Sequence, residues 1–125
     1  MNPLNLFKNS DNHERFAAGA TIFHQGDQGD YMYVVMEGEV DVIADGKYIR
    51  TLKAGDIFGE MSLIDDAPRS ADTVAKTDCV LALVDERRFL FLVHETPMFA
   101  LHMLGVMARR LRAANPSTAQ TQPAE

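Results

Sequence analysis

The sequence predicts a mainly β domain of short antiparallel strands that is closed at its C-terminal end by helices. Seven of the eight glycines lie between positions 19 and 59, separated by β-branched and aromatic residues, which is typical of strands joined by tight turns. From Asp85 onward the apolar residues recur at helical spacing, with charged residues between them. A chain of 125 residues can bury a core without a metal or a disulfide. We therefore expect a single domain over residues 1–114, with its β body over about residues 16–84.

Six runs rich in β-branched and aromatic residues are expected to be the strands: 20–24, 31–36, 39–44, 48–52, 73–76 and 79–84. Asp45 and Gly46 separate two of these runs, and both residue types tolerate the positive φ that a primed hairpin turn needs. This pair therefore predicts a tight hairpin. Residues 3–10 are expected to form at most a short helix against the β body.

Two helices are expected over residues 85–114. Thr96-Pro97 predicts the start of the second one, because proline at the first helical position gives up a donor that has no partner there. Pro116 cannot continue a helix, so it predicts the end. The polar stretch that follows lacks large apolar groups, and residues 115–125 are expected to be a disordered tail.

Charge and composition exclude several classes of partner. The formal net charge of −6 repels nucleic acid and anionic membranes, so we expect neither DNA nor a membrane as a partner. No run reaches the ~18 apolar residues that span a bilayer, and no signal peptide is apparent. We therefore expect a cytoplasmic protein. Cys79 is the only cysteine and lies in an apolar run, which predicts a buried, unreactive thiol.

The segment GDIFGEMSLIDDAPRSADTV, residues 55–74, carries the chemistry. A short helix beginning near Glu60 would present free backbone donors, and Gly59 would let a ligand approach the backbone closely. Arg69 can grip two phosphate oxygens at once, and Ser70 adds a hydroxyl. Residues 53–72 carry two cations and five carboxylates, a local charge of −3, so geometry rather than net charge must hold an anion. A singly charged cyclic phosphodiester suits such a site better than a triphosphate.

The run FGEMSLIDDAPRSA closely resembles the phosphate-binding cassette of the cyclic-nucleotide-binding domain family, which includes catabolite activator proteins, protein kinase A regulatory subunits and nucleotide-gated channels. The resemblance extends from about residue 16 to residue 111, since AAGATIFHQGDQGDYMYVVMEGEVDV is similar to the first strands of the family and GVMARRL to the helix after them. It implies an antiparallel β-roll, a double-stranded β-helix of jelly-roll type, with a short N-terminal helix and C-terminal helices.

The resemblance also implies roles for individual residues. Glu60 would accept a hydrogen bond from the ribose 2′-hydroxyl and would also neutralise Arg69 in the absence of ligand. Arg69 would bind the cyclic phosphate with help from Ser70. The ligand-binding set that we predict is Gly59, Glu60, Met61, Ser62, Arg69, Ser70 and Ala71. Cyclic AMP is the expected ligand, with cyclic GMP as the alternative, because the Ser70 hydroxyl could serve either the phosphate or a guanine amino group.

Two features depart from the family pattern. Asp72 stands where relatives often carry a small hydroxyl or apolar residue, so it either lowers phosphate affinity or simply faces solvent at the start of a strand. Asn115-Pro116 follows soon after GVMARRLR, which predicts that a full helical lid over the base is missing.

Catalysis is not expected. The four histidines lie far apart without the spacing of a metal site, and the sequence lacks a Gly-x-Ser-x-Gly elbow, a Walker-type loop and a catalytic Cys-His grouping. We predict no enzyme activity, no catalytic residue, no metal and no cofactor.

Two functional hypotheses remain open. In the first, nucleotide binding moves a hinge near residues 87–93 and repositions the last helix, which signals to a separate protein or to a second copy of the chain. In the second, the same fold is a constitutive interaction or dimerisation module whose ligand preference is altered, for example toward a cyclic dinucleotide.

Overall fold

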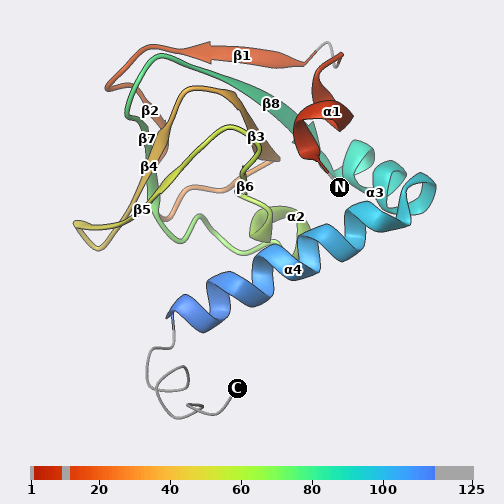
Figure 1. Ribbon diagram of the computed structural model, residues 1–125. Helices are drawn as coiled ribbons and strands as arrows, with labels where there is room; N and C mark the ends of the chain where they lie inside the picture. The colour runs from red at the N-terminus through yellow and green to blue at the C-terminus, as the bar shows by residue number, and fades with distance from the viewer. Residues whose placement is uncertain (1, 10–11, 115–125) are drawn as a thin grey trace, which may run out of the picture. The chain divides into compact units, whose positions relative to one another are not determined.

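The computed structural model describes residues 2–9 and 12–114 and divides the chain into two compact units (Figure 1). The first unit comprises residues 2–89, and the second begins at Leu90. The boundary falls inside helix α3 (Glu86–Glu95). The prediction of one domain over residues 1–114 stays a prediction.

The first unit is a β-roll of eight strands with two short helices. Its elements, in chain order, are α1 (Pro3–Phe7), β1 (His13–Phe16), β2 (Thr21–Phe23), β3 (Tyr31–Glu37), β4 (Val40–Ala44), β5 (Lys47–Leu52), β6 (Ile57–Phe58), α2 (Met61–Asp65), β7 (Asp72–Ala75) and β8 (Cys79–Asp85). Two four-stranded antiparallel sheets result, in the orders β1-β8-β3-β6 and β2-β7-β4-β5. The predicted mainly β class and the β-roll are confirmed.

The core lies between the two sheets and draws on both of them. Side chains of β3 and β8, such as Val35 and Leu81, meet side chains of β4 and β7, such as Val40 and Ala75. All four are buried. Successive strand residues point to opposite faces, so each strand can present one apolar face to this core and the other to its surroundings.

The strands agree with the predicted ones except at two places. β1 was missed because its sequence, HERF, is mostly charged; it is an edge strand whose residues are largely exposed and which pairs with β8. β6 was missed because it has only two residues. The predicted hairpin turn is confirmed, since Asp45 and Gly46 have φ angles of 52° and 77°.

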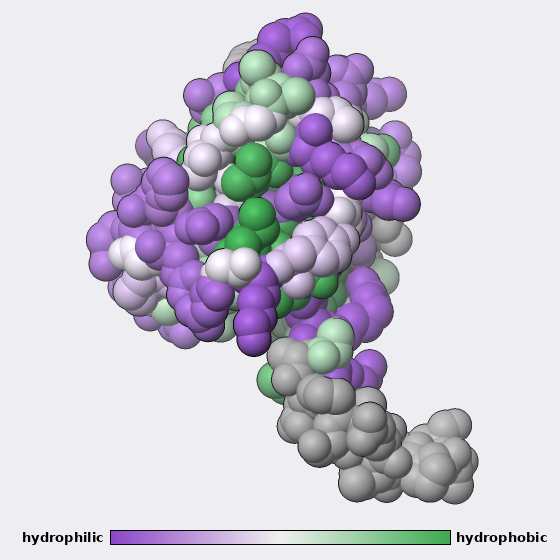
Figure 2. Space-filling view, turned by 90° about the vertical axis from the view of Figure 1, so that its left-hand side faces the viewer, coloured by the Kyte–Doolittle hydropathy of each residue, from purple (hydrophilic) through white to green (hydrophobic). Residues whose placement is uncertain are grey.

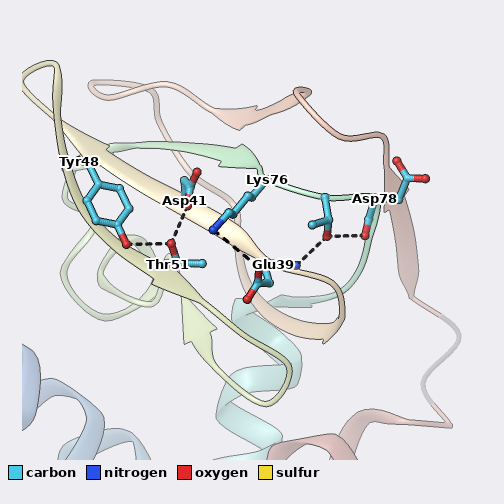
Figure 3. A network of polar contacts seen from close by, with 7 residues as sticks. Glu39, Asp41, Tyr48, Thr51, Lys76 and Asp78 are labelled. Atoms are coloured by element: carbon cyan, nitrogen blue, oxygen red, sulfur yellow. Dashed lines mark hydrogen bonds and ion pairs between the residues drawn. The ribbon is translucent and has the colours of Figure 1, made fainter.

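Polar side chains on β4 and on the edge strand β5 contact one another across the sheet (Figure 3). The hydroxyl of Thr51 donates to a carboxylate oxygen of Asp41 at 2.7 Å, and it lies 2.8 Å from the hydroxyl of Tyr48. Asp41 and Thr51 are direct partners in the β4–β5 register. These side chains therefore add to the backbone pairing that joins β4 to β5.

The second unit contains most of α3 and all of α4 (Pro97–Ala114). Pro97 is the first residue of α4, as the Thr96-Pro97 pair predicted. The carbonyl of Leu92 accepts from the Thr96 amide at 2.8 Å and so closes the end of α3. The predicted tail, residues 115–125, lies outside the described residues.

Among the described residues, no single helix is long and apolar enough to cross a membrane. Helices α3 and α4 meet that test only when taken together, as a pair bent by 113°.

Candidate functional site

Arg69 is the centre of the candidate site, and it is buried inside the first unit. Only 5% of the residue is exposed, which is unusual for an arginine. Its Nη1 donates to the carbonyl oxygen of Gly59 at 2.8 Å, and its Nη2 donates to the carbonyl oxygen of Tyr31 at 2.7 Å. The side chain is therefore held by two backbone segments that lie far apart in the sequence.

Aromatic rings lie against the same guanidinium. Its central carbon is 4.1 Å from the centroid of the Phe23 ring and 5.7 Å from that of Tyr33. A cation above a ring face is attracted by the ring quadrupole, and the attraction grows when water is excluded. The pKa of Arg69 is lowered from its ordinary value, mainly by burial. Tyr33 and the nearby carboxylates act in the opposite direction and offset part of this effect. The pKa of Tyr33 is raised, mainly by burial, and the charge of Arg69 offsets part of this effect.

Two glycines make room for the guanidinium. A Cβ placed on Gly29 would overlap the central carbon of the Arg69 guanidinium, and a Cβ on Gly59 would lie 2.7 Å from Nη1. Gly59 also has a φ of 77°, which other residues rarely adopt. Gly29 has no such backbone requirement, so the close approach of Arg69 is what demands a glycine there. Position 59 was predicted to allow close approach, and the group that approaches it is the arginine itself.

Glu60 lies at the start of α2, as predicted, and is 4% exposed. Its carbonyl oxygen accepts from the amides of Leu63 and Ile64, at 3.0 and 3.2 Å, and so forms the first turn of the helix. Its carboxylate is among the anions that raise the pKa of Arg69. The two residues that were predicted to read the ribose and the phosphate are therefore both buried and electrostatically coupled.

The other predicted site residues lie on the same segment but differ in exposure. Met61 and Ser70 are exposed, whereas Ser62 and Ala71 are buried. The hydroxyl of Ser62 donates to the carbonyl of Ala67 at 3.2 Å, so it closes the turn after α2. Ser70 follows Arg69 directly and is an exposed residue.

Three of the five carboxylates in residues 53–72 are engaged by backbone amides. Asp56 accepts from the amide of Lys53 at 2.8 Å, and Asp65 accepts from the amide of Ala67 at 3.1 Å. Asp72 accepts from the amide of Gln25 at 2.6 Å. The acidic character of the segment thus has a structural reason, because these carboxylates shape the turns around Arg69.

Asp72 belongs to a set of contacts that joins the loop between β2 and β3 to the cassette. It is partly buried, and its carboxylate also lies 3.9 Å from His24 Nδ1. One residue beyond Gln25, the amide of Gly26 donates to the carbonyl of Arg69 at 2.7 Å, and the amide of Arg69 donates to the carbonyl of Asp27 at 2.8 Å. Asp72 therefore helps to position the loop that flanks Arg69.

Sequence reasoning missed the loop and ring residues that surround Arg69: Phe23, Gly29, Tyr31 and Tyr33. The sequence did give a reason to single out Gly29, since no evident hairpin turn accounts for a glycine at that position. The rings carried no such signal, because aromatic residues in strands are common in any core.

The buried guanidinium of Arg69 suits an anion. The described residues contain no group of three or more His, Cys, Asp or Glu side chains that could hold a metal ion. A guanidinium can bind a phosphate-like group through parallel hydrogen bonds, and the exposed Ser70 is the next residue along the chain.

The region around the cassette matches a known family. A family model described as the cyclic nucleotide-binding domain matches residues 13–96, and this range contains every residue of the site.

Two relatives of this chain have names that refer to cyclic AMP. It is 41% identical over 84 residues to a cAMP-dependent protein kinase regulatory subunit of Eremothecium gossypii, a match that covers 67% of this chain and 18% of the relative. It is 38% identical over 105 residues to the cyclic AMP receptor protein of Thermus thermophilus, covering 80% of this chain and 49% of that protein. The chain therefore spans less than half of the length of these relatives.

A solved structure has the same architecture. The crystal structure of the Thermus thermophilus catabolite activator protein superimposes with a TM-score of 0.78 at 33% identity, covering 88% of this chain and 54% of the other.

Proposed function

The chain belongs to the cyclic nucleotide-binding domain family, and we propose that it binds a cyclic nucleoside monophosphate, preferentially cyclic AMP, without altering it chemically. The observation that carries this proposal is the buried, cationic Arg69 between Gly29 and Gly59. Burying a cation is energetically unfavourable, and a bound anion offsets part of that penalty. The preference for cyclic AMP is supported by the names of the relatives, two of which refer to cyclic AMP.

Each part of such a ligand has a residue suited to it. Arg69 binds the cyclic phosphate, and the exposed hydroxyl of Ser70 assists it. The Glu60 carboxylate, an acceptor only, takes a hydrogen bond from the ribose 2′-hydroxyl. Gly59, Met61 and Ala71 supply backbone and wall contacts, while Ser62 keeps the turn closed.

We further propose that the domain is regulatory and signals through its C-terminal helices to a separate protein or to a second copy. Support comes from the relatives, which include a kinase regulatory subunit and a receptor protein. The boundary between the two compact units also falls inside residues 87–93, where a hinge was predicted. A ligand that contacts the two conformations differently would shift the balance between them.

A second function is favoured by one observation. Both terminal nitrogens of Arg69 already donate to backbone carbonyls, as they would if the arginine served only to stabilise the roll. The chain would then be an interaction or dimerisation module, with an altered ligand such as a cyclic dinucleotide or with none.

Titration with cyclic AMP, cyclic GMP and a cyclic dinucleotide separates these functions, with calorimetry and thermal unfolding as readouts. A ligand at 100 times its Kd adds about 2.7 kcal/mol to the free energy of unfolding. We expect cyclic AMP to produce this shift. A shift with the dinucleotide alone, or with none of the three while the chain self-associates in sedimentation, would favour the second function.

The Arg69→Ala variant tests the role of the guanidinium. Truncation of one partner of a buried charged pair costs about 2–5 kcal/mol of binding free energy, so the Kd for cyclic AMP should rise accordingly. Arg15→Ala is the matched control, because Arg15 is an exposed arginine on the edge strand β1. An unchanged Kd in a folded Arg69→Ala protein would remove Arg69 from the site.

A further inference from the structure

Two buried polar atoms stand out in the part of the chain that the structure describes. Arg69 Nε and Thr73 Oγ1 are the buried side-chain nitrogen or oxygen atoms there that lack a hydrogen-bond partner. The proposed phosphate explains the first of them. Thr73 is 2% exposed, and nothing in the proposed function so far uses its hydroxyl.

The hydroxyl-bearing side chain of Thr73 faces the interior of the β-roll. Thr73 lies in β7 and pairs directly with Phe23 of β2 and with Val42 of β4. Directly opposed residues of an antiparallel pair point to the same face of the sheet, and both partners pack against the core. Asp72 and Val74, the neighbours of Thr73 along β7, alternate to the other face.

A purely structural role does not explain a threonine at this position. A buried hydroxyl without a partner is destabilising, whereas valine has nearly the same shape and no polar atom to satisfy. Buried polar groups are nearly always hydrogen-bonded, so an exception calls for an explanation of its own. A ligand that supplies the missing partner is such an explanation.

Thr73 is also close enough to Arg69 for one small molecule to reach both. The two residues are four positions apart, which bounds their separation at about 14 Å of extended chain. The Phe23 ring connects them, since it is opposite Thr73 and lies 4.1 Å from the Arg69 guanidinium carbon. Figure 2 views the molecule from the side on which the sheet β2-β7-β4-β5 is drawn in Figure 1. Apolar residues gather on this side inside a polar border.

From this arrangement we propose that the Thr73 hydroxyl hydrogen-bonds the substituent at position 6 of the purine in the bound nucleotide. This inference rests on the proposed function, in which Arg69 takes the phosphate and Glu60 the ribose, so that the base is the part left for Thr73. A hydroxyl both donates and accepts, so it can pair with the amino group of adenine or with the carbonyl oxygen of guanine. The apolar side chains opposite Thr73, those of Phe23 and Val42, suit the faces of the purine.

Two substitutions separate a ligand contact from a structural role. Thr73→Val removes the hydroxyl and keeps the shape, whereas Thr73→Ser keeps the hydroxyl. Calorimetry should show that Thr73→Val raises the Kd for cyclic AMP and cyclic GMP about fivefold to twentyfold, and that Thr73→Ser stays within about threefold of the unaltered protein. Without ligand, the melting temperature of Thr73→Val should be unchanged or higher, because an unsatisfied group is gone.

A third ligand locates the contact on the base. Purine riboside 3′,5′-cyclic monophosphate has no substituent at position 6, so Thr73→Val should bind it as well as the unaltered protein does. An equal loss with this analogue, or no loss with cyclic AMP, would overturn the inference while the proposed function stands. If the unaltered protein binds no cyclic nucleotide, the proposed function fails, and this inference fails with it.

Discussion

The guanidinium carbon of Arg69 lies 4.1 Å from the centroid of the Phe23 ring, inside the β-roll. The same ring has its centroid 5.9 Å from those of Tyr33 and Phe58, which belong to the core between the sheets. One aromatic side chain therefore links the buried charge of the candidate site to the hydrophobic core. Because the core holds the ring, it also helps to hold the arginine.

The first prediction concerns the contribution of this ring to stability. Phe23→Leu should lower the free energy of unfolding by about 2 kcal/mol or more, because a desolvated cation–π interaction is lost together with aromatic packing. Urea unfolding followed by circular dichroism measures it. Phe16→Leu is the control, since Phe16 is also partly buried against the core. Equal losses for the two variants would contradict a special contribution from the Arg69–Phe23 pair.

The second prediction concerns the space that Gly29 leaves. Gly29→Ala should displace the Arg69 guanidinium and raise the Kd for cyclic AMP at least about tenfold, while overpacking costs about 1–3 kcal/mol of stability. Calorimetry and thermal unfolding measure the two effects. Gly46→Asn is the control, because a Cβ at Gly46 meets nothing within 4 Å and asparagine tolerates its positive φ. Tight binding by a folded Gly29→Ala protein would show that this placement of Arg69 is not needed.

The third prediction tests whether Glu60 reads the ribose. The 2′-deoxy analogue of cyclic AMP should bind about 1–3 kcal/mol more weakly than cyclic AMP, because the buried carboxylate loses a partner. In Glu60→Ala the difference between the two ligands should vanish, since the group that reads the hydroxyl is gone. Should the variant keep the full discrimination, another residue contacts the 2′-hydroxyl.

The fourth prediction concerns Asp72, whose carboxylate accepts from the Gln25 amide at 2.6 Å. Asp72→Ala should cost about 1–3 kcal/mol of stability, whereas Asp72→Asn keeps an acceptor oxygen and should cost less. Unfolding curves for the two variants give the comparison. The same two proteins test whether the carboxylate opposes phosphate binding: a Kd for cyclic AMP that falls in both would mean that its charge outweighs its positioning role.

The fifth prediction follows from the environment of Cys79. Burial raises the pKa of its thiol, and the neighbouring Asp78 adds to the effect. Above pH about 8.5 the unfolded chain releases this proton while the folded protein retains it, so stability falls as the pH rises through that range. The decline should be shallower in Cys79→Ala.

Thiol labelling gives an independent measure of the same residue. At pH 8 an aromatic disulfide reagent should react slowly with the folded protein and rapidly with the protein in urea, because only the unfolded chain exposes the sulfur. Immediate labelling under native conditions would contradict burial of Cys79.

Local signals were sufficient for much of the fold. The Asp45-Gly46 hairpin and the helix start at Pro97 follow from backbone preferences of single residues, and both were predicted. The predicted strands are those rich in β-branched and aromatic residues; β6 was not predicted, because two residues are too few to form a pattern even though both are buried. β1 was not predicted either, because an exposed edge strand of mostly charged residues has no apolar pattern and is stabilised by pairing with β8, 63 residues or more away in register.

The candidate site divides in the same way. The sequence alone was enough to propose Arg69 and Glu60, because both lie on one short cassette whose residues and their order resemble those of the family; their burial is what the structure adds. Only the tertiary structure could bring Tyr31, 38 positions away, and Gly29 against the guanidinium, or turn Thr73 inward. These contacts depend on the pairing of β7 with β2 and β4 and on the path of the loop before β3. Strand register brings together residues that are distant in the chain, and a local sequence pattern does not specify which distant residues will pair.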